Sequence, residues 1–315
     1  MKRIYPILFA LAASLALTSC REDALNPESV ITLDQRTQND FDKWLDANYV
    51  TPYNILVKYR FESNESDLNY WTTPANLDCS IKMAHLVKYL CIDTYDEVGG
   101  VRFTQKYFPK EFFYIGEWEY KNNGTYILGT AEGGKKILLS GLNYLPQIMS
   151  GGYQGYKDPA AALNHFYIKT IHHEFTHILN QTKAYPETFG SITSTTYVGD
   201  ACFSTDDYWR GRGYITDYAQ SEHREDFAEL LSEYISHSAE WWQEQLDAAH
   251  AETTQVRKDD PNAEYGDVYI QSKIDIVRTY MQDCWNIDID ELRDILGRRF
   301  KDVTDGLVDL SSVKH

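Results

Sequence analysis

Two histidines and a glutamate occupy neighbouring turns of one predicted helix. The segment from Ile171 to Gln181 reads IHHEFTHILNQ, in which His173 and His177 stand four residues apart. Four residues advance an α-helix by about 400°, so both imidazoles lie on one face and can reach one metal ion. Glu174 lies about 100° away, where its carboxylate can reach a water on the metal without binding the metal. The spacing predicts a zinc site with His173 and His177 as ligands and Glu174 as general base.

The helix that carries these residues has a predicted core-facing stripe. Apolar residues recur at helical spacing at Leu163, Phe166, Ile171, Phe175, Ile178 and Leu179. Asp158-Pro159 is typical of a helix start. The alternative, two solvated histidines on a surface helix, fits this stripe poorly, because buried imidazoles beside a carboxylate are costly unless something binds them.

A zinc ion held by two histidines needs a third protein ligand and an open position for water. A histidine six residues after His177 would complete an extended zinc motif, but that position holds Lys183. Farther on, Glu225 and Glu229 stand one turn apart on a helix predicted over Glu222–Gln245. As surface neighbours they would repel each other, and a cation bound by one and a histidine held by the other would remove that cost. For this pair taken alone, the alternative that both glutamates lie on a solvated acidic face of the helix stays open.

The two segments together resemble a family of zinc-binding metallopeptidase lipoproteins, which diderm bacteria encode beside glycan-uptake operons. The resembling residues are HEFTHILNQ from His173 and YAQSEHREDFAE from Tyr218, and the likeness extends through most of the mature chain. The motifs are more distantly similar to the lethal-factor-type zinc peptidases of the gluzincin class. The resemblance therefore implies a zincin-like fold and a peptidase activity.

The resemblance also implies a role for each matching residue. Glu225, which stands 48 residues after His177, would be the third zinc ligand, and Glu229 would be the carboxylate behind a histidine ligand. Tyr218 would help to stabilise the oxyanion. The residues just before Glu225 depart from the family pattern, and His223 among them is a competing candidate for the third ligand.

The N-terminus predicts export and a lipid anchor. A short basic start precedes an apolar run from Ile7 to Leu17, which is too short to span a bilayer, and then LTSC ends at Cys20. The pattern is typical of a secretory signal and resembles a bacterial lipobox, which implies cleavage before Cys20 and a lipid on its thiol. We expect a signal peptide over 1–19, a lipidated tether over 20–35, and a location in the cell envelope, anchored to the outer membrane.

The charge balance excludes nucleic acid as a partner. The chain has 30 basic and 47 acidic residues, a net charge of −17. Binding to a phosphate backbone needs clustered lysine and arginine, which this chain lacks. A content of 43 % hydrophobic and 24 % charged residues is a globular mixture, so we expect a folded domain with a sizeable core.

The remaining cysteines and histidines indicate no further site. Besides Cys20 there are four cysteines, at positions 79, 91, 202 and 284. An exported chain permits disulfides, and the sequence leaves disulfide pairing and buried free thiols equally open. We expect His165, His172 and His237 to be structural or at the surface.

The order of the predicted elements favours an α+β fold. The first half is predicted to contain helices at Phe41–Leu45 and Pro74–Asp96 and strands at Tyr53–Phe61, Phe112–Tyr120, Thr125–Leu128 and Lys136–Leu139. After a connector over Glu187–Gly213, helices are predicted at Glu222–Gln245, Val268–Gln282 and Ile289–Phe300. We therefore expect one metallopeptidase domain over 36–315, with the sheet and active-site helix in 36–185 and a helical part in 186–315.

Site and resemblance together imply a lipid-anchored zinc peptidase. Zinc would lower the pKa of its bound water to about 7, and Glu174 would take the water's proton and pass it to the leaving amine. A peptide or protein substrate would pair with a sheet edge at Thr125–Leu128 or Lys136–Leu139. Two alternatives stay open: an accessory lipoprotein that works with outer-membrane glycan-uptake proteins and keeps a vestigial zinc site, and a zinc hydrolase for another substrate.

Overall fold

The computed structural model describes residues 37–62, 69–120, 126–127, 129–132, 135–204 and 208–314. Those from Asp40 onward form one compact unit. The predicted signal peptide and the predicted lipid anchor Cys20 lie outside the described residues. Of the helices that are described, none is long and apolar enough to cross a membrane.

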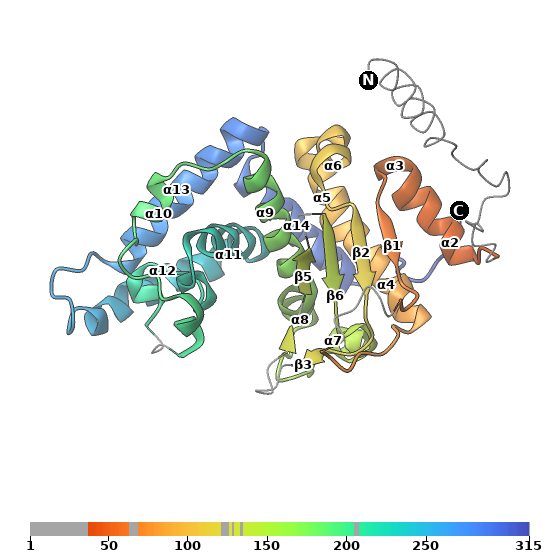
Figure 1. Cartoon of the computed structure of the whole chain (residues 1–315), viewed down its shortest axis with the longest axis horizontal. Coiled ribbons are helices and arrows are strands. Elements are labelled where there is room, and N and C mark those ends of the chain that lie inside the picture. Colours follow the sequence, from red (N-terminus) through yellow and green to blue (C-terminus); the bar gives the residue numbers. More distant parts are fainter. Residues whose placement is uncertain are drawn as a thin grey trace, which may run out of the picture. The chain divides into compact units, whose positions relative to one another are not determined.

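Four short strands form the main sheet of the described chain. Their order across the sheet is β1 (Leu56–Lys58), β2 (Glu111–Tyr114), β6 (Lys136–Leu139) and β5 (Gly129–Glu132) (Figure 1). β1, β2 and β6 run parallel, and β5 pairs with β6 antiparallel. Because successive side chains of a strand point to opposite faces, Phe112 and Tyr114 enter the main core, while Phe113 packs in a smaller cluster with Ile115 and Leu138.

The observed strands differ from the predicted ones. The predicted strand Phe112–Tyr120 is two strands, β2 and β3 (Glu119–Tyr120). Between them, Ile115 and Gly116 pair with the backbone next to Pro74 and interrupt the strand. A Cβ on Gly116 would lie 2.2 Å from the Pro74 carbonyl oxygen, so this close approach requires glycine.

One of the two predicted sheet edges is wrong. Lys136–Leu139 is β6, which lies inside the sheet between β2 and β5. Of Thr125–Leu128 only β4 (Tyr126–Ile127) is described as structure, and it pairs with β3 in a separate two-stranded sheet. The outer strand of the main sheet next to β6 is β5, which contacts the helix that carries the histidines.

Helices fill the connection between β1 and β2. A parallel pair of strands needs a crossover of a dozen or more residues, and here it contains α4 (Leu77–Val87), α5 (Asp93–Gly99) and α6 (Val101–Tyr107). The helix predicted over Pro74–Asp96 is confirmed as α4 and α5, joined by a π-helical turn. The helix α6 was not predicted. The helix predicted at Phe41–Leu45 is confirmed as α2 (Asp40–Leu45), which continues through a π-helical turn into α3 (Thr51–Tyr53).

The helix that carries the two histidines begins as predicted. After α7 (Leu145–Ser150), the carboxylate of Asp158 accepts hydrogen bonds from the backbone N–H groups of Ala160 and Ala161 at the start of α8 (Pro159–Leu163). A π-helical turn leads directly from α8 into α9 (Lys169–Thr182), which carries the two predicted ligands His173 and His177.

The second half of the chain is helical. Its helices are α10 (Thr188–Ser191), α11 (His223–Ser236), α12 (Ala239–Val256), α13 (Gly266–Trp285) and α14 (Ile289–Thr304). The prediction of a single helix over Glu222–Gln245 is wrong, because the helix is interrupted at His237. The hydroxyl of Ser238 then caps the start of α12 by accepting a hydrogen bond from the backbone N–H of Trp241. The α+β expectation therefore holds only in part: the described chain is mostly helical, with helices before and between the strands.

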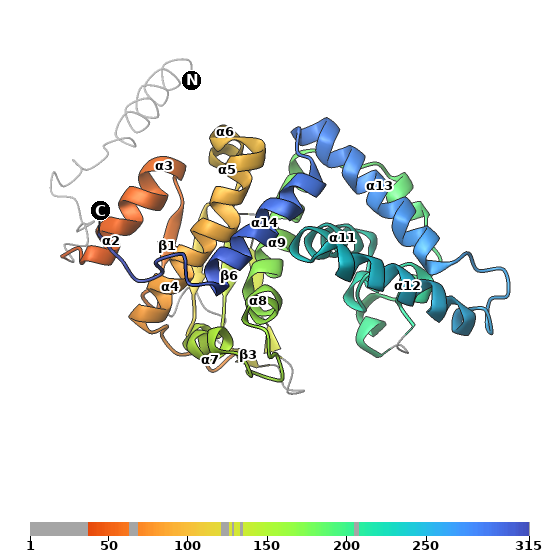
Figure 2. The same cartoon turned by 180° about the vertical axis from the view of Figure 1, so that it is seen from behind.

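Helix α9 packs along α11, and this pair positions the candidate site (Figures 1 and 2). Phe175 and Leu179 of α9 and Phe227 and Leu231 of α11 are buried in the common core. Helix α14 returns to the first half of the chain, where Arg298 and Arg299 pair with Glu97 of α5 at 2.6 and 2.8 Å.

Candidate metal centre

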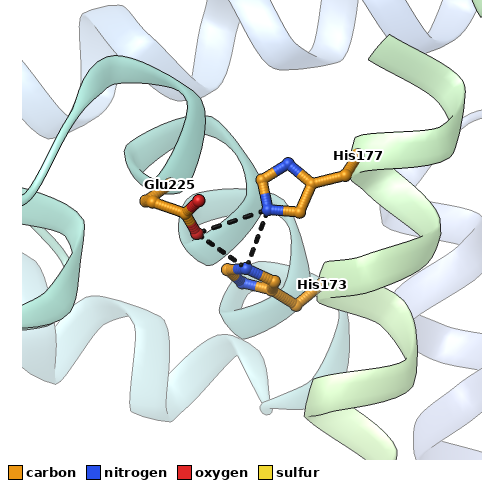
Figure 3. Close-up of side chains that lie close together, drawn as sticks. All are labelled: His173, His177 and Glu225. Atoms are coloured by element: carbon orange, nitrogen blue, oxygen red, sulfur yellow. Dashed lines mark hydrogen bonds and ion pairs between the residues drawn. The ribbon is translucent and has the colours of Figure 1, made fainter. Parts of the chain in front are cut away.

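Two imidazoles and one carboxylate converge between α9 and α11 (Figure 3). His173 Nε2 lies 3.0 Å from His177 Nε2, and Glu225 Oε2 lies 3.0 and 3.3 Å from the two nitrogens. The potential ligand atoms of the three residues all lie within 4.8 Å of one another. Two histidine nitrogens and one carboxylate oxygen are a ligand set that suits zinc and leaves a fourth position open.

Local helix geometry explains how each side chain reaches the cluster. His173 and His177 lie one turn apart on α9, as their spacing predicts. Glu225 lies in the first turn of α11, where the helix dipole favours a negative charge. The side chains of His177 and Glu225 are 19 % and 18 % exposed, whereas that of His173 is 7 % exposed, so the cluster is open to solvent on one side.

Opposite charges within the cluster stabilise each other. Burial disfavours a charge on His173, but the carboxylates of Glu225 and Glu229 raise its pKa to about 9. Burial also disfavours ionised Glu225, but His173 and His177 hold its pKa well below the usual range. A divalent cation would replace the protons at these nitrogens, since metal ligands must be deprotonated.

Glu229 lies behind His173. Its Oε1 lies 2.8 Å from His173 Nδ1, on the side of the ring away from the cluster. Its Oε2 accepts hydrogen bonds from Lys169 Nζ at 2.8 Å and Thr216 Oγ1 at 2.7 Å. With its side chain only 2 % exposed, Glu229 is a buried carboxylate that can orient the imidazole of a ligand.

Glu174 and Tyr218 border the cluster. Burial raises the pKa of Glu174, while the charges of His173 and His177 oppose that shift. The Tyr218 ring lies 6.1 Å from the His173 ring, and the Phe203 ring stacks on Tyr218 at 5.8 Å. Burial raises the pKa of Tyr218, and the negative charge of Glu225 raises it further, so the phenol stays a hydrogen-bond donor.

The competing ligand candidate points elsewhere. His223 is exposed at the start of α11, and its Nδ1 hydrogen-bonds the Tyr185 hydroxyl at 2.6 Å. It is not part of the cluster of ligand atoms, so the geometry favours Glu225 over His223.

The other singled-out residues lie outside the cluster. His172 is buried and hydrogen-bonds Tyr95, His165 stacks on Tyr156, and His237 lies 3.0 Å from Glu233. All three contacts are structural in kind, as expected. The four cysteines in the described ranges are free thiols, and three of them are buried.

Two contacts of the site were missed by the sequence reasoning. Lys169 precedes His173 by four residues, so helical spacing alone could have placed it on the same face of α9. Thr216 carries no comparable signal, because its contact with Glu229 depends on how the loop before α11 folds back.

Comparisons with known proteins identify a family. The model of a family described as "Putative zinc-binding metallo-peptidase" matches residues 34–290, which include both ligand-bearing helices. The chain belongs to this family. The resemblance predicted from the HEFTHILNQ segment is thereby confirmed at the level of the family.

A solved structure supports the zinc-binding metallo-peptidase fold. The crystal structure of a putative zinc-binding metallo-peptidase from Bacteroides caccae is similar to this chain with a TM-score of 0.70 and 32 % sequence identity. The match covers 91 % of this chain and 100 % of that one. Among curated proteins, none matches the chain.

Proposed function

We propose that this protein is a zinc-dependent peptidase in which His173, His177 and Glu225 hold the ion. The observation that carries the proposal is the convergence of two imidazole nitrogens and one carboxylate oxygen within 4.8 Å, in a member of a zinc-binding metallo-peptidase family. The buried carboxylate behind His173 supports it, because metal-binding histidines commonly contact a carboxylate through their second nitrogen.

The residues around the cluster suit peptide hydrolysis. A bound zinc ion supplies a Lewis acid and lowers the pKa of a coordinated water to about 7. Glu174 accepts a proton from the attacking water and later gives it to the leaving amine. Tyr218 remains protonated and donates a hydrogen bond to the carbonyl oxygen as negative charge develops there.

The substrate is proposed to bind as an added strand along β5. This strand is at the edge of the main sheet and contacts α9, so a peptide paired with its backbone would run past the histidines. Among the described residues, β5 pairs only with β6, so its second edge could form main-chain hydrogen bonds to a peptide.

Lipid anchoring at Cys20 remains part of the proposal and rests on the N-terminal sequence, in which a basic start and an apolar run precede LTSC. An outer-membrane location beside glycan-uptake proteins rests on the family resemblance. Cys20→Ser removes the thiol that would carry the lipid, so the variant is expected in the soluble fraction or as uncleaved precursor. A processed Cys20→Ser variant that still fractionates with membranes would contradict the anchor.

The decisive experiment compares the wild type with Glu174→Gln. The purified protein is incubated with casein, with and without a chelator, and then with added zinc. Glutamine cannot accept the proton, so kcat should fall by about 10²-fold or more while zinc content stays unchanged. Glu187→Gln makes the same chemical change at an exposed position outside the cluster and should keep wild-type activity.

Three outcomes distinguish the alternatives. Chelator-sensitive cleavage of casein that Glu174→Gln abolishes supports the peptidase. Chelator-sensitive cleavage of a glycan, with casein intact, would indicate a zinc hydrolase of another class. Binding of zinc and glycan without any cleavage would indicate an accessory binding protein.

A further inference from the structure

Glu229 is held by side chains from two other parts of the chain. His173 and Lys169 belong to α9, Glu229 to α11, and Thr216 to the loop before α11. The contacts lie between 2.7 and 2.8 Å and use both carboxylate oxygens, with Oε1 facing His173 Nδ1 and Oε2 accepting from Lys169 and Thr216. The carboxylate therefore cannot rotate without losing at least one contact.

Lys169 compensates the charge of this carboxylate. Its ammonium also lies 3.3 Å from Glu233, one turn farther along α11. Burial disfavours the charged lysine, but the two carboxylates raise its pKa above the usual value. Lys169 thus lies between two buried carboxylates, those of Glu229 and Glu233.

Thr216 makes a second hydrogen bond, to the backbone of the turn that contains the candidate catalytic tyrosine. Its hydroxyl donates to Glu229 Oε2 at 2.7 Å and accepts the backbone N–H of Ala219 at 3.1 Å. Ala219 follows Tyr218 directly, and both lie in the 3-10 turn Tyr218–Gln220. One hydroxyl therefore joins the carboxylate behind a predicted metal ligand to the turn that presents Tyr218.

We propose that Thr216 is a positioning residue that links His173 to Tyr218 through Glu229. The inference rests on the proposed metal site and is independent of peptidase activity. A metal bound by His173 would hold the imidazole ring in one orientation. The ring would then restrain the carboxylate of Glu229, which in turn would restrain the Thr216 hydroxyl and, through it, the backbone of the turn. The tyrosine is thereby held in one place relative to the metal.

The link can be cut without changing the shape of the side chain. Thr216→Val keeps the branched shape and removes both hydrogen bonds. Thr216→Ser keeps the hydroxyl and should rescue the link. Thr182→Val is the matched control, because Thr182 lies on α9 and its hydroxyl only bonds the Ile178 carbonyl within the same helix, at 2.9 Å.

The first measurement is zinc affinity, determined by competition between the metal-free protein and a chelator. Thr216→Val should bind zinc more than about threefold more weakly, but less than the about 10- to 100-fold that follows loss of a direct partner of a metal ligand, because Thr216 acts on His173 only through Glu229. Thr216→Ser and Thr182→Val should stay within about threefold of wild type. A Thr216→Val variant that folds and binds zinc as tightly as wild type would overturn the proposal.

The second measurement reports on the turn itself. Zinc should slow backbone hydrogen exchange over 216–221 in wild type and in Thr216→Ser, but much less in Thr216→Val. An equal effect of zinc on this segment in all three would also overturn the link. Neither measurement needs substrate, so absence of casein cleavage would contradict the proposed function while leaving this inference intact.

Discussion

The first turn of α11, which carries Glu225, is held by a buried ion pair whose removal should be costly. Lys273 Nζ of α13 lies 2.6 Å from Asp226 Oδ2, and the two side chains are 0 % and 1 % exposed. The Tyr197 hydroxyl donates to the same carboxylate oxygen at 2.7 Å, and Lys273 also donates to the Gly213 carbonyl at 2.8 Å. Burial raises the pKa of Asp226 and lowers that of Lys273, so each group depends on the other to stay charged.

The cost follows from leaving one charge behind. Asp226→Asn leaves a buried ammonium and Lys273→Met leaves a buried carboxylate, and either change should reduce the free energy of unfolding by about 3–5 kcal/mol. Replacing both partners by apolar residues, as in Asp226→Leu with Lys273→Met, removes both charges. The double variant still leaves the Tyr197 hydroxyl and the Gly213 carbonyl without these partners, so its free energy of unfolding should be about 1–3 kcal/mol below that of the wild type.

Urea unfolding of the metal-free protein, followed by circular dichroism, measures these differences. Asp305→Asn is the control, because it breaks the exposed Lys301–Asp305 pair of one helix and should cost less than about 1 kcal/mol. If Asp226→Asn costs no more than the control, the buried pair does not hold α11. If the double variant loses the sum of the two single losses, uncompensated charge is not the reason for the cost.

Three further predictions concern the site and its surroundings. Glu225→Ala should lose most of the bound zinc measured by atomic absorption, while His223→Ala should keep it, and the reverse result would exchange their roles. Tyr218→Phe should keep zinc and lower kcat rather than raise KM, by about 10²- to 10³-fold, because the hydroxyl acts on charge that develops in the transition state. Burial lowers the pKa of His172 to about 3, so between this value and the ordinary value near 6.5 only the unfolded chain takes up the proton. Stability is therefore lost as pH falls through this range, and His172→Gln should show a shallower loss in urea unfolding at a series of pH values; equal slopes would show that His172 does not titrate in this way.

Local spacing was enough to predict the part of the site that lies on one helix. The positions of His173, Glu174 and His177 follow from a turn of 3.6 residues, and they hold in any fold that keeps α9 helical. The cap at Asp158 and the core stripe of α9 are local in the same sense. The resemblance of YAQSEHREDFAE to a known family added Glu225, Glu229 and Tyr218, which spacing alone could not have linked to the histidines.

Pairing between strands could not be predicted in the same way. The apolar runs of β2 and β6 are compatible with a parallel or an antiparallel sheet, since periodicity describes the faces of one strand and not its neighbour. The parallel order arises because α4, α5 and α6 carry the chain back between β1 and β2. The pairing of β6 with β2 on one side and with β5 on the other leaves β6 inside the sheet and makes β5 the edge strand near α9.

The supports of the site were decided only by the tertiary structure. Packing of α9 along α11 brings Lys169, Glu229 and Glu233 together, and the fold of the preceding loop brings the Thr216 hydroxyl to the same carboxylate. The structure favours Glu225 over His223 as the candidate ligand for a similar reason, since the two residues stand two positions apart on one helix and point in different directions. The sequence by itself determined which side chains can bind a metal, whereas side-chain directions and long-range packing decided which of them meet.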